Sequence, residues 1–236
     1  MNQSQGQSIT RMEDLSNELF NEIFDYLDGL DILRVFSNLN HRFQRFIHSP
    51  IFLFKIQIHQ TKDQQSINKY KPIIDEYKHR IISFHIYLSL RNNSSHELYS
   101  FDSSFDHLES ISFTGIHPHA LRSSLIRLSA VPRLYSLTID TWNDFNDLQW
   151  IYRSIFALPT LKFYKFTISE SRNRIYQISL PMANRNERST IKYLHMVHSC
   201  SINELEHIVS YTPELRHLKF INNSEDYLDS GSFQYQ

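Results

Sequence analysis

The chain has 236 residues, of which 41% are hydrophobic and 14% aromatic, and its formal net charge is −1. This apolar content excludes a chain that is disordered throughout, and the balanced charge lacks the basic footprint of a general nucleic-acid binder. The four glycines form no phosphate-binding motif, which excludes the nucleotide-binding enzymes built on glycine-rich loops. The single cysteine, Cys200, has no disulfide partner in the chain, so we expect a reducing compartment: the cytoplasm, the nucleus or both.

The two ends of the chain are polar. Residues 1–11 are rich in glutamine and serine, and we expect a disordered N-terminus there and a flexible tail at residues 225–236. The first segment lacks the apolar core of a signal peptide, and no later run approaches the roughly 18 apolar residues that span a bilayer. We therefore predict neither secretion nor a membrane partner.

The first organised segment begins with an amphipathic helix. Ser16 is expected to cap its N-terminus, and Gly29 is expected to end it in a left-handed conformation. Acidic residues occupy the opposite side of this helix. The apolar residues at helical spacing are Leu19, Phe20, Ile23, Phe24 and Leu27.

Two further short helices should follow before Pro50. Asp31 is expected to cap the second helix, and Asn38 or Asn40 the third. Three short helices enclose little interior, yet this segment carries Leu, Ile and Phe on more than one face. Part of its apolar surface should therefore be exposed for a partner.

The order of residues from Leu15 to Pro50 resembles the F-box. The matching features are an E-L-x-x-x-I-F-x-Y-L core at residues 18–27, a D-x-L after it, and a basic and aromatic helix that ends in Ser-Pro; Ser16 stands where proline is usual. The resemblance implies docking onto the adaptor of SCF-type ubiquitin ligases and, through it, onto the cullin scaffold. The alternative is an ordinary helical subdomain whose apolar stripe is core. The matching adaptor-contact positions are Leu15, Leu19, Ile23, Leu27 and Leu33.

Past Pro50, an apolar pattern Φ-x-x-Φ-x-Φ recurs six times. Successive patterns start 27, 26, 27, 30 and 24 residues apart, intervals within or close to the range of leucine-rich repeats. Apolar periodicity predicts helices between the patterns at residues 120–130, 145–157 and 201–211. The first positions of the six patterns are Ile81, Leu108, Leu134, Leu161, Ile191 and Leu215.

The predicted fold class is α/β. A three-helix F-box at residues 12–50 is followed by a linking region at 51–80, with a strand near 51–58 and a helix near 68–78. Residues 81–224 then form a solenoid of strand-loop-helix units with a parallel sheet, which resembles the irregular leucine-rich repeats that often follow an F-box. A chance alignment of ordinary β-α units is the alternative.

The sequence contains no recognisable catalytic or metal-binding motif. Its thirteen histidines lack Cys or carboxylate partners at the spacing of metal ligands, and we interpret Cys200 as a small packing residue. We therefore predict a protein that is not an enzyme and uses no metal and no cofactor. Because catalytic triads are defined by geometry rather than by sequence order, a small hydrolase with an unrecognised site stays as an alternative.

The positions between the apolar ones should face outward from the sheet in three columns. The first column is Ser83, Ser110, Ser136, Phe163, Tyr193 and His217; the second is His85, Ser112, Thr138, Lys165, His195 and Lys219; the third is Tyr87, Thr114, Asp140, Thr167, Val197 and Ile221. Aromatic and basic groups gather in the last three units, as they do at protein interfaces. A solvated sheet face without a ligand is the alternative. The predicted target-binding residues are Phe163, Lys165, Tyr193, His195, His217 and Lys219.

These features together predict a substrate-recognition subunit of an SCF-type E3 ubiquitin ligase, which acts in ubiquitin-dependent protein degradation. The F-box would dock on the adaptor, and the repeats would hold a target protein by protein–protein interaction. A leucine-rich-repeat scaffold that works independently of a ligase is the main alternative.

Overall fold

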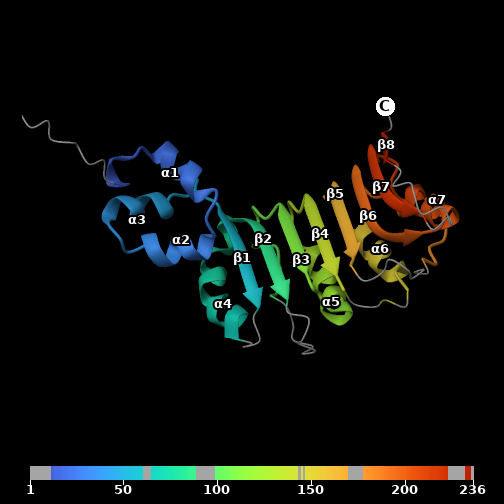
Figure 1. The fold of residues 1–236 in the computed structure, drawn as a ribbon, viewed down its shortest axis with the longest axis horizontal. Coiled ribbons are helices and arrows are strands. Elements are labelled where there is room, and N and C mark those ends of the chain that lie inside the picture. Colours follow the sequence, from blue (N-terminus) through green and yellow to red (C-terminus); the bar gives the residue numbers. More distant parts are fainter. Residues whose placement is uncertain are drawn as a thin grey trace, which may run out of the picture.

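The computed structural model describes residues 12–60, 65–88, 99–142, 145, 147–169, 178–222 and 232–234. These residues contain seven α-helices and one eight-stranded sheet, whose strands lie side by side in chain order (Figure 1). Strands β1 to β7 are parallel, and β8 is antiparallel to β7. The predicted α/β class and parallel sheet are confirmed. Among the helices so described, none has the length and apolar character needed to cross a bilayer.

Three short helices stand at the β1 end of the sheet (Figure 1). Helix α1 begins after Ser16, whose hydroxyl accepts a hydrogen bond from the Leu19 N–H at 3.4 Å. Helix α3 begins after Asn40, whose side chain accepts from the Phe43 N–H at 3.0 Å. Both residues act as the N-caps predicted for them. The helices are α1 (Asn17–Phe24), α2 (Gly29–Phe36) and α3 (His41–Ile47).

Phenyl rings fill the space between these three helices. Phe20 lies edge-on to Phe43, with ring centroids 4.8 Å apart, and Phe24 lies 4.9 Å from Phe36. Edge and tilted contacts of this kind add to the free energy gained by burying the rings. Phenyl rings therefore form much of this interior, together with the buried aliphatic side chains Leu30, Ile32, Leu33 and Ile47.

The start of α2 differs from the prediction. Asp28, not Asp31, caps the helix, and its carboxylate accepts from the Leu30 N–H at 2.9 Å. Gly29 is the first residue of α2 and does not end α1 in a left-handed conformation. A Cβ atom on Gly29 would lie 2.9 Å from Ile56 Cδ1, too close for an ordinary contact. Glycine is needed here because the helix packs directly against strand β1.

Strand β1 (Phe54–Gln60) joins the helices to the sheet. The other oxygen of the Asp28 carboxylate accepts a hydrogen bond from the backbone N–H of Gln57 in β1. Strand β1 pairs with β2 and is the first strand of the sheet. Asp28 therefore satisfies a backbone donor on an edge strand that would otherwise be open to another chain.

Arg80 ties the end of α3 to the start of β2. Its buried guanidinium donates to the carbonyl oxygens of Ile47 at 2.5 Å, Ser49 at 2.6 Å and Phe52 at 2.7 Å. It also lies over the ring of Phe54, 5.0 Å from the centroid. Carbonyl oxygens at a helix C-terminus favour a cation, so they offset part of the cost of burying this charge.

The rest of the chain adds strands one after another. Helices α5, α6 and α7 lie along one side of the sheet (Figure 1), at or near the three positions predicted for helices. The β2–β3 and β5–β6 connections contain no helix in their described parts, residues 99–109 and 178–192. The remaining elements are α4 (Gln65–Tyr77), β2 (Ile81–Leu88), β3 (Ser110–Thr114), α5 (Pro118–Leu128), β4 (Ser136–Thr141), α6 (Gln149–Phe156), β5 (Phe163–Ile168), β6 (Tyr193–Cys200), α7 (Ile202–Ser210), β7 (His217–Asn222) and β8 (Ser232–Gln234).

The apolar positions of the six recurring patterns form the core of the sheet. Seventeen of the eighteen are buried, and the exception, Leu215, is partly buried. Period-two alternation is visible in β4, β5 and β6, where buried and half-buried residues follow each other. Helices cover the buried side, and the other side carries the columns of outward positions.

The two ends of the chain lie largely outside the described residues. The expected disordered segment, residues 1–11, is one such part. Within the expected tail, Ser232–Gln234 forms β8 and pairs with residues 217–219 of β7. The sequence pattern predicts no strand there, because three residues are too few to show an alternation.

Candidate functional site

An exposed apolar row runs along α1. Leu19 is 44% exposed, and Ile23 and Leu27 are each 38% exposed. Leu19 and Ile23 lie one helical turn apart in α1. Leu27 lies four residues after Ile23, just past the end of this helix. Leu15 is half-buried and packs against the core. The structure therefore leaves three of the five predicted adaptor-contact side chains open to a partner.

Leu33 does not share this surface. It is only 6% exposed and belongs to the hydrophobic core, so in the free chain it offers little surface to an adaptor. Val35 and Leu39 are instead about half exposed at and just after the end of α2. The sequence analysis did not single out either residue as a contact position.

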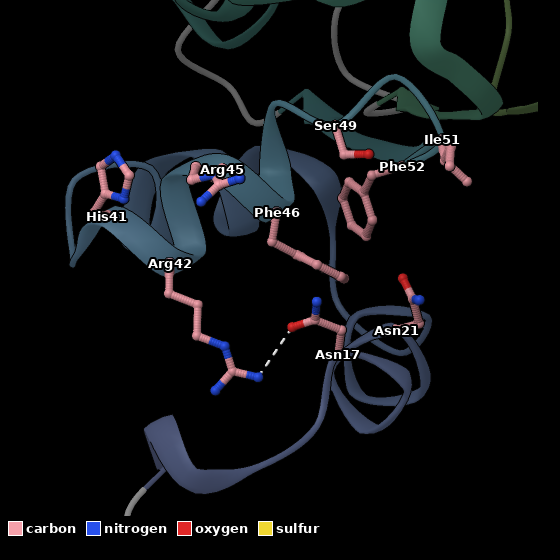
Figure 2. A pocket seen from close by; sticks show the side chains of 9 residues that line it. All are labelled: Asn17, Asn21, His41, Arg42, Arg45, Phe46, Ser49, Ile51 and Phe52. Atoms are coloured by element: carbon pink, nitrogen blue, oxygen red, sulfur yellow. Dashed lines mark hydrogen bonds between the residues drawn. The ribbon is translucent and has the colours of Figure 1, made fainter.

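A basic pocket of about 580 Å³ lies between α1 and α3 (Figure 2). Arg42 points across it, donating to Asn17 Oδ1 at 3.0 Å and to the Leu15 carbonyl at 2.5 Å. Arg45 lines the same pocket, and Phe46 and Phe52 form an apolar wall. Such a lining suits an acidic side chain presented beside an apolar one.

The pocket and the apolar row occupy different sides of α1. Asn17 and Asn21 line the pocket, and each is two positions from Leu19. Two positions correspond to about 200° around a helix, so these asparagines face away from the row. The N-terminal unit therefore offers two separate surfaces.

The six predicted target-binding residues lie together on three neighbouring strands. In the first column, Phe163 is paired in register with Tyr193, and Tyr193 with His217. The Tyr193 and His217 rings are stacked, 4.9 Å apart and 9° from parallel. In the second column, the register partners are Lys165, His195 and Lys219.

Positive charge dominates this part of the sheet. Burial lowers the pKa of His195 below its usual value, and the nearby Lys219, Lys165 and His217 side chains lower it further. Lys165 and Lys219 make no ion pair with any acid in the described part of the chain. Glu214 instead lies 3.8 Å from Lys162 and Lys192, at the start of the strands.

Comparison with known families supplies the assignment of the N-terminal unit. The F-box domain model matches residues 12–55, which cover the three helices and the start of β1. Residues 12–55 are an F-box domain. F-box domains bind the adaptor of SCF complexes, and F-box proteins generally are not themselves enzymes. No family match supports the leucine-rich-repeat assignment, and neither the curated proteins nor the solved structures contain a significant match to the chain.

The F-box match extends five residues beyond the predicted boundary at residue 50. The difference has a structural reason, because Phe52 and Phe54 complete the aromatic interior. Phe52 lies edge-on to Phe24 at 5.7 Å, and Phe54 lies edge-on to Phe52 at 5.1 Å. The F-box and the first strand of the sheet therefore share core residues.

The third outward column breaks between the last two parallel strands. The register shifts between His195 and Ser199 of β6, so that Ile221 lies beside Ser199 instead of Val197. An irregularity of this kind cannot be read from apolar spacing. The six predicted target-binding residues lie before the shift and keep their alignment.

Two polar side chains of β6, His198 and Cys200, are buried. Burial raises the pKa of the Cys200 thiol to about 12, so this thiol is protonated at neutral pH. The Tyr152 hydroxyl lies 2.6 Å from His198 Nε2, and His198 Nδ1 lies 3.0 Å from the Ser199 carbonyl. Across the described ranges, no group of three His, Cys, Asp or Glu side chains could hold a metal ion.

Proposed function

We propose that this chain is a substrate-recognition subunit of an SCF-type E3 ubiquitin ligase. The F-box at residues 12–55 carries the proposal, because F-box domains bind the SCF adaptor. The exposed row of Leu19, Ile23 and Leu27 provides apolar surface for that contact. The sheet would hold a target protein and present it for ubiquitin-dependent degradation.

The chain would act by proximity and not by side-chain chemistry. Adaptor and cullin fix one end of the chain, and a target bound to the sheet then meets the transfer machinery at high effective concentration. A stiff connection between the F-box and the sheet favours this role. Arg80 and Asp28 supply direct hydrogen bonds between the F-box region and the sheet.

We interpret the sheet as an irregular leucine-rich-repeat solenoid. Support comes from the chain order of its strands, their parallel direction and the regular burial of the Φ-x-x-Φ-x-Φ positions. Repeat proteins stack units so that each contacts only its neighbours, and their extended faces bind partners. The target site would be the outward patch of Phe163, Lys165, Tyr193, His195, His217 and Lys219.

The test of adaptor docking is co-purification of the full chain with the SCF adaptor. Changing Leu19→Asp together with Ile23→Asp should abolish the complex, because each carboxylate would be buried unpaired in an apolar interface at a cost of about 1–3 kcal/mol or more. The matched control changes Ile126→Asp and Ile202→Asp, two exposed apolar residues on α5 and α7. The control should bind the adaptor like the wild type.

A ligase-independent scaffold makes a different prediction in the same experiment. Such a protein would show no adaptor binding by the wild-type chain, or equal binding by wild type and the Leu19/Ile23 double variant. Either result would refute the docking proposal. A reconstituted ubiquitin-transfer assay with a captured target would then separate a weak ligase subunit from a scaffold.

A further inference from the structure

The outward face of the sheet carries a second aromatic cluster that the sequence analysis did not identify. Strand β1 places His59 beside Tyr87 of β2, with rings stacked 4.3 Å apart and 4° from parallel. His85 stacks on the same tyrosine at 4.0 Å and 20°. We name His59, His85 and Tyr87 the β1–β2 cluster.

The β1–β2 cluster differs in charge from the cluster at the other end of the sheet. Burial lowers the pKa of His85 below its usual value, and the neighbouring His59 lowers it further, so His85 is neutral at pH 7. The second cluster consists of Phe163, Tyr193, His195 and His217, flanked by Lys165 and Lys219; we name these six residues the β5–β7 cluster. One end of the face is therefore aromatic, and the other is aromatic and cationic.

Small hydroxyl side chains separate the two clusters. Strands β3 and β4 present serine and threonine outward, and the Ser112 hydroxyl lies 3.0 Å from His85 Nε2. The one acid of this strip, Asp140, accepts a hydrogen bond from Ser169 Oγ at 3.0 Å. The outward residues of the strip are Ser110, Ser112, Thr114, Ser136, Thr138 and Asp140.

The distance between the clusters suits a short stretch of extended chain. Neighbouring strands lie about 4.8 Å apart, so β2 and β5 are separated by roughly 14 Å across the sheet. Tyr87 is aligned in register with Thr167, four residues past Phe163, which adds about 13 Å along the strand direction. Tyr87 and Phe163 are therefore roughly 20 Å apart, and an extended polypeptide, which advances about 3.3 Å per residue, covers this distance in about six residues. Serine and threonine hydroxyls can both donate to and accept from a backbone that crosses them.

We propose that the outward face binds an extended acidic segment of a target protein, which crosses β2 to β5 and places one apolar side chain on each cluster. Its acidic residues lie at the β5–β7 end, where Lys165 and Lys219 have no acidic partner among the described residues. The charge asymmetry decides which end of the segment lies over β5. This inference rests on the proposed target-binding role of the sheet, and it adds the class of ligand and the spacing of its anchors.

Selection of a randomised peptide library on the full chain tests the proposal. Enriched peptides should carry two apolar residues about six positions apart, with Asp or Glu beside one of them. One enriched peptide, fluorescently labelled, is then titrated by anisotropy. Changing His85→Ala with Tyr87→Ala, or Phe163→Ala with Tyr193→Ala, should each weaken its binding about tenfold or more, whereas Tyr26→Ala, an exposed aromatic of the F-box, should not.

The outcomes separate this inference from the proposed function. If binding depends on the β5–β7 cluster but not on His85 and Tyr87, the two-anchor inference is wrong and the target site on the last strands survives. If neither pair matters, or if single-stranded RNA competes better than any enriched peptide, both the inference and the target site are overturned. Adaptor co-purification is scored independently in every case.

Discussion

The F-box and the sheet bury their apolar residues in opposite ways. In the F-box, α1 has phenyl rings on its inner side and exposes Leu19 and Ile23 on another. In the sheet, nearly every apolar position of the repeated pattern is buried, and the outward positions of β3, β4 and β5 are hydroxyl, aromatic or charged. The F-box leaves a row of apolar side chains exposed, whereas each strand of the sheet completes the core with the next strand of the same chain.

This difference indicates where each region depends on a partner. Each parallel strand of the sheet receives its neighbours from the same chain, so its core needs no second protein. Three helices enclose too little volume to bury both sides of α1, and an adaptor can cover the remaining row. Four predictions test this contrast, from the largest expected effect to the smallest.

The inner side of α1 should matter far more for folding than the outer side. Phe20 is buried and lies against Phe43 and the guanidinium of Arg42, so Phe20→Ala should lower the free energy of unfolding by about 3–5 kcal/mol. Leu19→Ala should change it by less than about 1 kcal/mol. Urea unfolding followed by circular dichroism measures both. Equal midpoints for the two variants would contradict the assigned orientation of α1.

The buried histidine of the sheet should make its stability depend on pH. Burial lowers the pKa of His198 from 6.5 to about 4, while the Ser199 carbonyl and the charge of Glu204 act weakly in the opposite direction. The unfolded chain therefore binds this proton more readily than the folded chain. The stabilisation is complete above pH 6.5 and is lost as the pH falls to about 4, by about 3 kcal/mol.

Denaturant unfolding at a series of pH values measures this loss. His198→Asn should flatten the pH dependence between 6.5 and 4, whereas the exposed His119→Asn should leave it unchanged. An unchanged slope in the His198 variant would show that another group titrates.

Loss of the Arg80 contacts should uncouple the F-box from the sheet. Arg80→Met leaves three backbone carbonyls without this donor, and we expect the free energy of unfolding to fall by about 2 kcal/mol. Hydrogen exchange at residues 47–54 should accelerate. Arg34→Met, which removes an exposed pair with Asp31, should cost about 0.5 kcal/mol or less. Similar exchange in both variants would mean that Arg80 does not hold the junction.

Charge reversal on the sheet should give the smallest effect. Lys165→Glu with Lys219→Glu should weaken an enriched acidic peptide by about 1 kcal/mol, and the loss should shrink in high salt because exposed charges are screened. Lys69→Glu with Lys71→Glu, two exposed lysines of α4, is the matched control. A loss that is independent of salt would indicate a packing defect instead of a charge effect.

Local sequence signals predicted much of this molecule. Ser16 and Asn40 cap their helices because a side-chain oxygen needs only a neighbouring turn to bond. The prediction for Gly29 was wrong because its role comes from Ile56, which is distant in sequence. The burial of Leu33 was likewise not predicted, since the F-box resemblance that marks it as a contact position does not say how far neighbouring helices cover it.

The candidate binding surfaces were likewise predicted from the sequence only in part. Register pairing of Phe163 with Tyr193 and of Lys165 with His195 agrees with the columns read from the repeat. The β1–β2 cluster was missed because β1 belongs to the linking region, where the repeat gives no guide to alignment. The binding role of either cluster stays a prediction.

The sequence by itself determined the F-box, the α/β class and which side of strands β2 to β7 is buried. These features depend on spacings of two to four residues, and such spacings are fixed by the geometry of a single helix or strand. Only the tertiary structure decided the place of Arg80, the stack of His59 on Tyr87 and the register shift at Ile221. Each of these depends on how residues more than twenty positions apart meet when one strand is laid against the next, and no local pattern encodes that alignment.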